Sequence, residues 1–148
     1  MGRLREVLQV AVPFVWFGMV VAISGIEAPL KFRAPGITQA LGLGIGRLVF
    51  RALNWGELLL LVVLAAVLVT SARAGLPLTL TGVLGLILLT QMFVLRPLLD
   101  ERAQVIIAGG VPTASSLHLV YIALEGAKLL LLPWLGAMLV LRLVGSSS

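Results

Sequence analysis

Three ionisable side chains interrupt the stretch SSLHLVYIALEGAKLLLLPW, residues 115–134, which is otherwise apolar enough for a lipid bilayer. At about 100° per residue, His118 and Glu125 lie almost on one line along a helix, and Tyr121 and Lys128 fall on the same broad stripe. A charged side chain at the centre of a membrane-spanning helix costs about 2.5–3.5 kcal/mol on insertion scales. These side chains are therefore expected to pair or to meet water rather than face lipid.

A second polar stripe lies between residues 51 and 57. Asn54 and Glu57 are three positions apart and share one helix face. If Glu57 joins Glu125 and Lys128, two carboxylates stand beside one ammonium group, which favours a shared proton and suits proton or cation handling. The alternative is a buried ion pair that only fixes the helix register.

A metal site is the other chemistry that these residue types suggest. A helix N-terminus disfavours the imidazolium form, so a neutral His118 together with Glu125 and Glu57 could ligate a divalent metal. A haem held by two histidines is excluded within one chain because there is a single histidine, and the absence of cysteine excludes thiolate sites. Ser115 is better explained as a helix cap than as a nucleophile paired with His118, because no acid partner or nucleophile turn accompanies them.

The composition predicts the elements that position these residues. Of the 148 residues, 60% are hydrophobic and only 11% are charged, which is typical of membrane proteins and does not support a soluble enzyme. The net charge of +5 comes from basic residues scattered at the flanks of apolar runs, so no nucleic-acid partner is expected. The apolar runs predict one all-α integral membrane domain, residues 1–148, with four transmembrane helices in an antiparallel bundle at about 7–27, 50–71, 76–96 and 117–141.

The connections differ in length. SARAGLP, which contains Arg73, predicts a tight hairpin between the second and third helices. In the long 28–49 connection, prolines at 29 and 35 are expected to break the first helix, and a short interfacial or re-entrant helix is expected before the second. Gly42, Gly44 and Gly46 are candidates for close helix packing, including packing between copies of the chain. A phosphate cradle at GLGIG is disfavoured because no strand precedes it. The 96–116 connection could hold a short surface helix.

Nearly all polar residues fall at one end of this bundle. Four antiparallel helices place the 28–49 and 96–116 connections on one side, and the polar stripes enter from that side. We therefore predict a one-sided polar cleft. Its expected residues are Glu57, Glu125, Lys128, His118, Tyr121, Asn54, Glu27 and Arg51.

Four segments, WFGMVVAISGIEAPLKF, GIGRLVF, LRPLLDER and SLHLVYIALEGAKL, resemble a family of small four-span bacterial inner-membrane proteins of unknown function. More remotely, the order of features is similar to a eukaryotic four-span family. The resemblance implies a four-helix fold in the bacterial inner (plasma) membrane and supplies no catalytic residues.

Three functions remain open. The first is transport or permeation of a proton, a cation or a small polar solute through the cleft, by a protein that forms a homo-oligomer because four helices seldom enclose a pore alone. The second is a membrane-embedded protein that binds a metal or a cofactor, with redox activity as one use of it. The third is an accessory or structural subunit that binds a partner membrane protein.

The orientation in the membrane is almost undecided. Six basic residues flank the helices on the side of the two long connections, and four flank them on the other side. The first helix is expected to be retained rather than cleaved as a signal peptide, and VGSSS to be a disordered tail.

Overall fold

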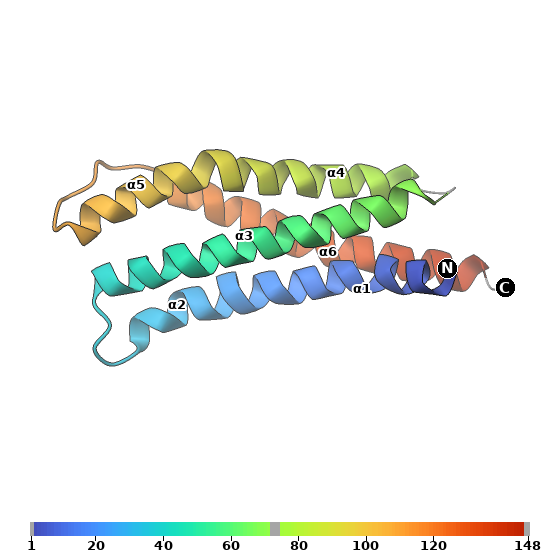
Figure 1. Ribbon diagram of the computed structural model, residues 1–148, viewed down its shortest axis with the longest axis horizontal. Coiled ribbons are helices and arrows are strands. Elements are labelled where there is room, and N and C mark those ends of the chain that lie inside the picture. Colours follow the sequence, from blue (N-terminus) through green and yellow to red (C-terminus); the bar gives the residue numbers. More distant parts are fainter. Residues whose placement is uncertain (1, 72–74, 147–148) are drawn as a thin grey trace.

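The computed structural model describes residues 2–71 and 75–146, and these residues form helices joined by short connections. Four helical runs are long and apolar enough to cross a membrane: Gly2–Arg33, Gln39–Val69, Gly75–Ile107 and Leu117–Gly145, here called spans 1 to 4. They lie side by side and alternate in direction, with both termini at one end of an all-α four-helix bundle (Figure 1). The predicted hairpin at SARAGLP lies partly, and Arg73 entirely, outside the described residues, and so does the end of the predicted tail.

Two of the spans are built from more than one helical segment. Span 1 consists of α1 (Gly2–Val20), the π-helical turn η1 (Val21–Glu27), α2 (Ala28–Leu30) and the 3₁₀ turn η2 (Lys31–Arg33). Span 2 is the single helix α3 (Gln39–Val69), and span 4 is α6 (Leu117–Ser146). Span 3 consists of α4 (Gly75–Thr90), the π-helical turn η3 (Gln91–Leu95) and α5 (Arg96–Ile107). The four predicted helices are present. At the end away from the termini, spans 1 to 3 extend beyond the predicted bounds, whereas span 4 begins at residue 117 as predicted.

Proline explains both π-helical turns and corrects one expectation. Each turn ends two positions before a proline: the Ala28 N–H donates to the Ile23 carbonyl just before Pro29, and the Arg96 N–H donates to the Gln91 carbonyl just before Pro97. A proline ring in a regular helix clashes with the carbonyl four residues earlier, and a π-helical turn moves the preceding carbonyls out of that position. The helix therefore continues past Pro29 instead of breaking there. In the same way α5 continues span 3 and is not a separate surface helix.

The expected interfacial or re-entrant helix between the first two spans is wrong. Residues 39–46 form the first turns of α3, which begins where the Thr38 hydroxyl accepts the Leu41 N–H at 3.2 Å. The chain turns into this cap at Gly36, whose φ of 80° favours glycine. The glycines are used within the chain: the Phe32 ring lies where a side chain on Gly42 would stand.

Lys31 packs in the same way against Gly46, where an added Cβ would lie 3.0 Å from the lysine Nζ. Gly42 and Gly46 thus let the end of span 1 lie close against α3. Nothing lies within 4 Å of a Cβ placed on Gly44. Of the three glycines predicted to pack against another copy of the chain, Gly42 and Gly46 already contact span 1, and Gly44 is the one with open space beside it.

The apolar core fills the half of the bundle that holds the termini. Leucines of three spans surround Trp16 of α1 there, and α1 packs along α6 over much of its length. The fully enclosed members of this core are Trp16, Val20, Leu64, Leu84, Leu88, Leu132 and Leu135. Large apolar side chains also cover the outside of every span, for example Leu59 at 64% and Leu130 at 76% exposure. The other half of the bundle carries the polar residues.

Candidate functional site

A buried lysine between two buried carboxylates joins spans 2 and 4. The Lys128 Nζ lies 2.5 Å from Glu57 Oε1 and 2.9 Å from Glu125 Oε1. Lys128 and Glu57 are fully enclosed, and Glu125 is 5% exposed. These three residues, predicted from their types and spacing, are brought together by the fold, and we call them the ionic cluster.

Side chains from spans 1 and 3 add hydrogen bonds to the ionic cluster, and Glu57 Oε2 is left buried without a partner among the described residues. The indole N–H of Trp16 donates to Glu57 Oε1 at 2.7 Å, and the Ser24 hydroxyl donates to Glu125 Oε2 at 3.1 Å. The Gln91 amide donates to Glu125 Oε1 at 3.0 Å. All four spans therefore supply a polar group to one point of the bundle, which is the arrangement that a buried charge requires.

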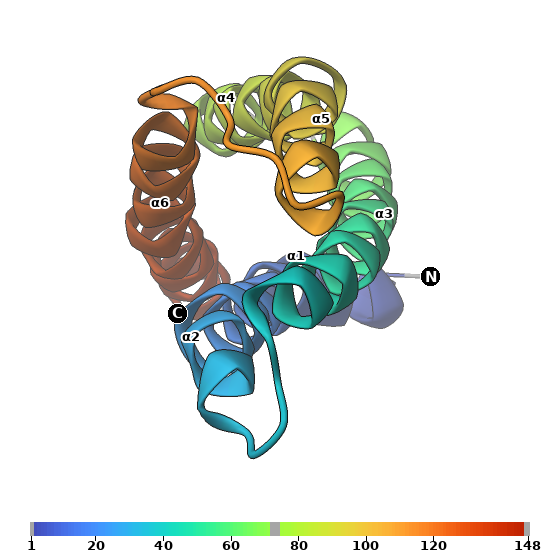
Figure 2. The same cartoon turned by 90° about the vertical axis from the view of Figure 1, so that its left-hand side faces the viewer.

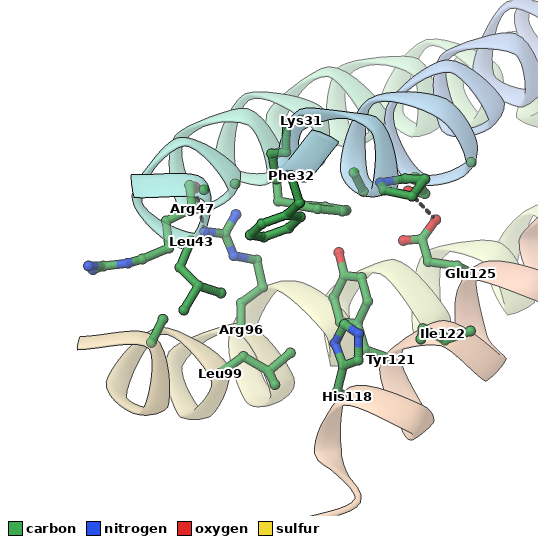
Figure 3. Close-up of a pocket in the computed structure, with 18 of the residues that line it drawn as sticks. Lys31, Phe32, Leu43, Arg47, Arg96, Leu99, His118, Tyr121, Ile122 and Glu125 are labelled. Carbon is green, nitrogen blue, oxygen red and sulfur yellow. Dashed lines mark hydrogen bonds between the residues drawn. The ribbon is translucent and has the colours of Figure 1, made fainter. Parts of the chain in front are cut away.

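A cavity of about 640 Å³ opens above Glu125, on the side away from the termini. Its walls come from all four spans, and viewed from that end the helices surround an open centre (Figure 2). Glu125 is the one member of the ionic cluster that lines the cavity, since Glu57 and Lys128 lie behind it. Figure 3 shows the arrangement of the lining side chains. They include Ser24, Lys31, Phe32, Arg47, Phe50, Arg96, Asp100, His118, Tyr121, Ile122 and Glu125.

The mouth of the cavity carries more positive than negative charge. Asp100 lies between two guanidinium groups, 3.4 Å from Arg47 Nε and 3.3 Å from Arg96 Nη2. Arg96 also donates to the backbone carbonyl of Arg47 at 2.9 Å, which ties α5 to α3. Lys31 pairs with Glu27 at 3.1 Å. The lysine balances Glu27, whereas one carboxylate faces two arginines, so the mouth has an excess of about one positive charge.

The Tyr121 hydroxyl is buried and has no hydrogen-bond partner. Its ring meets Phe50 edge to face, with centroids 5.8 Å apart, and its oxygen points away from α6 into the space between Phe32 and Glu125 (Figure 3). Lys31 lies 5.5 Å from the Phe50 centroid, a cation–π distance. A buried hydroxyl normally has a partner, so this group is a donor that a ligand in the cavity would satisfy.

Not every predicted cleft residue belongs to this cavity. Arg51 and Asn54 line a second hollow of about 300 Å³ between α3 and span 3, together with Trp55 and Phe93. Both amide atoms of Asn54 are buried without a hydrogen-bond partner. Glu27 is engaged by Lys31 near the mouth and does not line the cavity.

The predicted metal site does not form. His118 is exposed at the cavity wall, whereas Glu57 is sealed behind Glu125 and bonded to Lys128. Within the described part of the chain, no three His, Asp or Glu side chains gather as a metal site would need. Ser115 acts as a cap, as predicted, because its hydroxyl accepts the Leu117 N–H at 3.1 Å.

The two side chains of span 1 that bond to the ionic cluster were not expected from the sequence. Trp16 lies among apolar residues with no polar neighbour in sequence, and its only signal is that a buried indole N–H normally needs an acceptor. Ser24 carries no stronger signal than a serine inside an apolar run. Both are positioned by span 1, which places them along the same side of the bundle as Glu57 and Glu125.

Comparison with family models, with curated proteins and with solved structures finds no match to this chain. The resemblance to a four-span bacterial family therefore stays a prediction. Function has to be argued from the geometry of the cavity and of the ionic cluster.

Proposed function

We propose that this chain is a multi-pass membrane protein of the bacterial inner membrane. The four candidate spans contain 29 to 33 residues, which is roughly 44–50 Å of helix against a hydrocarbon core of about 30 Å. Large apolar side chains are exposed on every one of these helices. The excess length lies at the end away from the termini, where α5 and the first turns of α3 extend the bundle (Figure 1).

Helix length also gives the depth of the site in the proposed membrane. Arg5 donates to the Thr70 carbonyl at the end with the termini, and we take this contact as the level of one membrane surface. About 20 residues of helix cross the hydrocarbon, so the other surface lies near Arg51 of α3. Arg47 is then at the level of the head groups. Glu57 lies about 10 Å below the hydrocarbon surface, which is near Arg51. The ionic cluster is therefore inside the membrane, and the mouth is at its surface.

The proposed function is transport or permeation of a proton, a cation or a small polar solute through this one-sided cleft. One observation supports it above the others: Glu125 has one carboxylate oxygen on the cavity side, bonded to Ser24, and the other bonded to Lys128 of the ionic cluster. A proton or cation that passes Asp100 at the mouth meets this carboxylate at the inner end of the cavity, and Lys128 and Glu57 continue the polar path inward. Beyond them Trp16 and the leucine core close the path, so this conformation is open to one side.

Flux into proteoliposomes tests the proposal. Glu125→Gln keeps the size of the side chain and leaves Lys128 paired with Glu57, so the fold should be retained. We expect it to reduce proton or cation uptake by at least about tenfold, as for loss of a group used in each transfer. Glu101→Gln is the matched control, since Glu101 is exposed at the same end of the bundle and does not line the cavity.

A neutral version of the ionic cluster separates a transport role from a structural one. The variant Glu57→Gln/Glu125→Gln/Lys128→Met removes all three charges together and leaves no unpaired ion, a change that proteins often tolerate. Transport by Glu125 predicts a folded protein without flux. Flux equal to that of the wild type in this variant, or in Glu125→Gln, would refute the proposal.

An accessory subunit is the second candidate, and the hollow at Asn54 favours it. Its unpartnered amide lies between Trp55 and Phe93, which are 58% and 64% exposed. A helix of a partner membrane protein that offers a polar group would satisfy this amide. Native mass spectrometry of the protein released from membranes should then show a stoichiometric protein partner, or a second copy, that Asn54→Leu removes. A monomer in both samples would contradict this candidate.

A further inference from the structure

Two helical elements that line the cavity, the second half of span 1 and α6, separate from each other on one side of it. α1 packs along α6, but beyond the hydrogen bond from Ser24 to Glu125 the continuation of span 1 does not pack along α6 to a comparable extent. Cavity-lining residues occur on both sides of this separation, and Figure 2 shows α2 and α6 apart at this end. We call it the lateral gap, lined by Gly25, Ala28 and Pro29 of span 1 and by Ile122, Gly126 and Leu129 of α6.

The lateral gap is apolar and has free space. Nothing lies within 4 Å of a Cβ placed on Gly25 or on Gly126, and Ile122 is 51% exposed. In the proposed membrane this gap faces acyl chains, and it leads to Glu125. A carboxylate that is open to hydrocarbon is unfavourable, so something apolar is expected to fill the gap.

The mouth supplies a head-group site at the end of the gap. Arg47 and Arg96 share one carboxylate. Lys31 lies over the ring of Phe50, which is on α3 like Arg47. Guanidinium groups bind phosphate and carboxylate oxygens in a forked geometry. The buried Tyr121 hydroxyl, which has no partner, can donate to an anion in the same space.

We propose that the cavity binds one membrane lipid with an anionic head group. The head group lies between Arg47, Arg96 and Lys31, and one acyl chain lies in the lateral gap. A cavity of about 640 Å³ has the size of sites that hold small amphiphilic ligands. The chain would cover the side of the cavity, so that Glu125 is reached only through the mouth. This proposal goes beyond the transport function and does not depend on it.

Native mass spectrometry of the protein in bilayer nanodiscs tests the proposal. The bilayer is phosphatidylcholine with a minor fraction of phosphatidylglycerol, which differ in head-group charge at matched chain length. We expect one phosphatidylglycerol molecule to remain on the released protein. Arg47→Gln removes one charge-assisted contact and should weaken retention about tenfold. Gly126→Leu adds a side chain whose Cβ meets nothing within 4 Å; it should occupy the gap and abolish retention.

Two control variants match these changes. Arg33→Gln removes a positive charge from an exposed residue at the same end that does not line the cavity, and Gly18→Leu adds a side chain on α1 where nothing lies within 4 Å. Both should retain the lipid to within about twofold of the wild type. Arg47→Lys keeps the charge and should retain more lipid than Arg47→Gln, which shows that charge and not misfolding controls binding.

Four results would overturn the proposal. Three are unchanged lipid retention in Gly126→Leu, equal loss in Arg33→Gln and Arg47→Gln, and equal retention of phosphatidylcholine. The fourth is full displacement of the lipid by millimolar inorganic phosphate, because the acyl chain would then contribute nothing. Glu125→Gln should bind the lipid normally, so failure of the transport proposal and failure of this one give different results.

Discussion

Replacing Lys128 by Met should destabilise the protein more than any other single change in the ionic cluster. The Nζ atom lies 2.5 Å from Glu57 and 2.9 Å from Glu125, so the two carboxylate oxygens are no further apart than the sum of these distances, about 5.4 Å. Without the lysine, two ionised groups at that separation repel by about 3 kcal/mol at an effective dielectric constant near 20. Breaking a buried ion pair on one side usually costs about 3–5 kcal/mol, which agrees.

The measurement is reversible unfolding in mixed micelles, with sodium dodecyl sulfate as the denaturant and circular dichroism as the signal. Lys128→Met should lower the free energy of unfolding by about 3 kcal/mol. Adding Glu57→Gln and Glu125→Gln to it should restore stability to within about 1 kcal/mol of the wild type, because no unpaired charge is left. If the triple variant is as unstable as Lys128→Met, the cost comes from lost packing of the lysine stem, and the electrostatic reasoning is refuted.

Three further changes test local contacts by the same unfolding assay. Gly42→Leu places a side chain on the Phe32 ring and should cost about 1–3 kcal/mol, whereas Gly44→Leu meets open space and should cost less than about 0.5 kcal/mol; equal costs would contradict the packing. Thr38→Ala removes the N-cap of α3 and should cost about 1 kcal/mol, with faster amide hydrogen exchange in the first turn of that helix; unchanged exchange would contradict the cap. Trp16→Phe removes the indole donor to the ionic cluster and should cost about 1.5–3 kcal/mol; a neutral effect would show that this hydrogen bond is dispensable.

The number of helices and the ionic cluster could be predicted because each follows from a large free-energy term. Apolar runs of about 20 residues identify spanning helices, and the cost of unpaired charge in such a helix requires Glu57, Glu125 and Lys128 to find one another. The structure has four such helices and brings these residues together.

The direction in which individual side chains point could not be predicted. Arg47 and Arg51 are one helical turn apart, yet the first lines the cavity and the second lines the hollow at Asn54. The sequence gives no rotation of α3 about its axis, because that rotation is set by packing of Phe32 and Lys31 on its glycines. The same glycine-rich segment was expected to form an interfacial or re-entrant helix for this reason: small residues indicate close approach without indicating the partner.

The π-helical turns have a consequence for how residues are counted along spans 1 and 3. Hydrogen bonds to the residue five positions back hold one more residue than an α-helical turn does, so a helical wheel drawn through Val21–Glu27 or Gln91–Leu95 misplaces every later position. If a related chain lacked one residue in either segment, an α-helical turn would replace the π-helical turn. Lys31 or Arg96 would then stay on its present face of the helix. An alignment of such chains should then show single-residue gaps just before these prolines, inside helices that both chains retain.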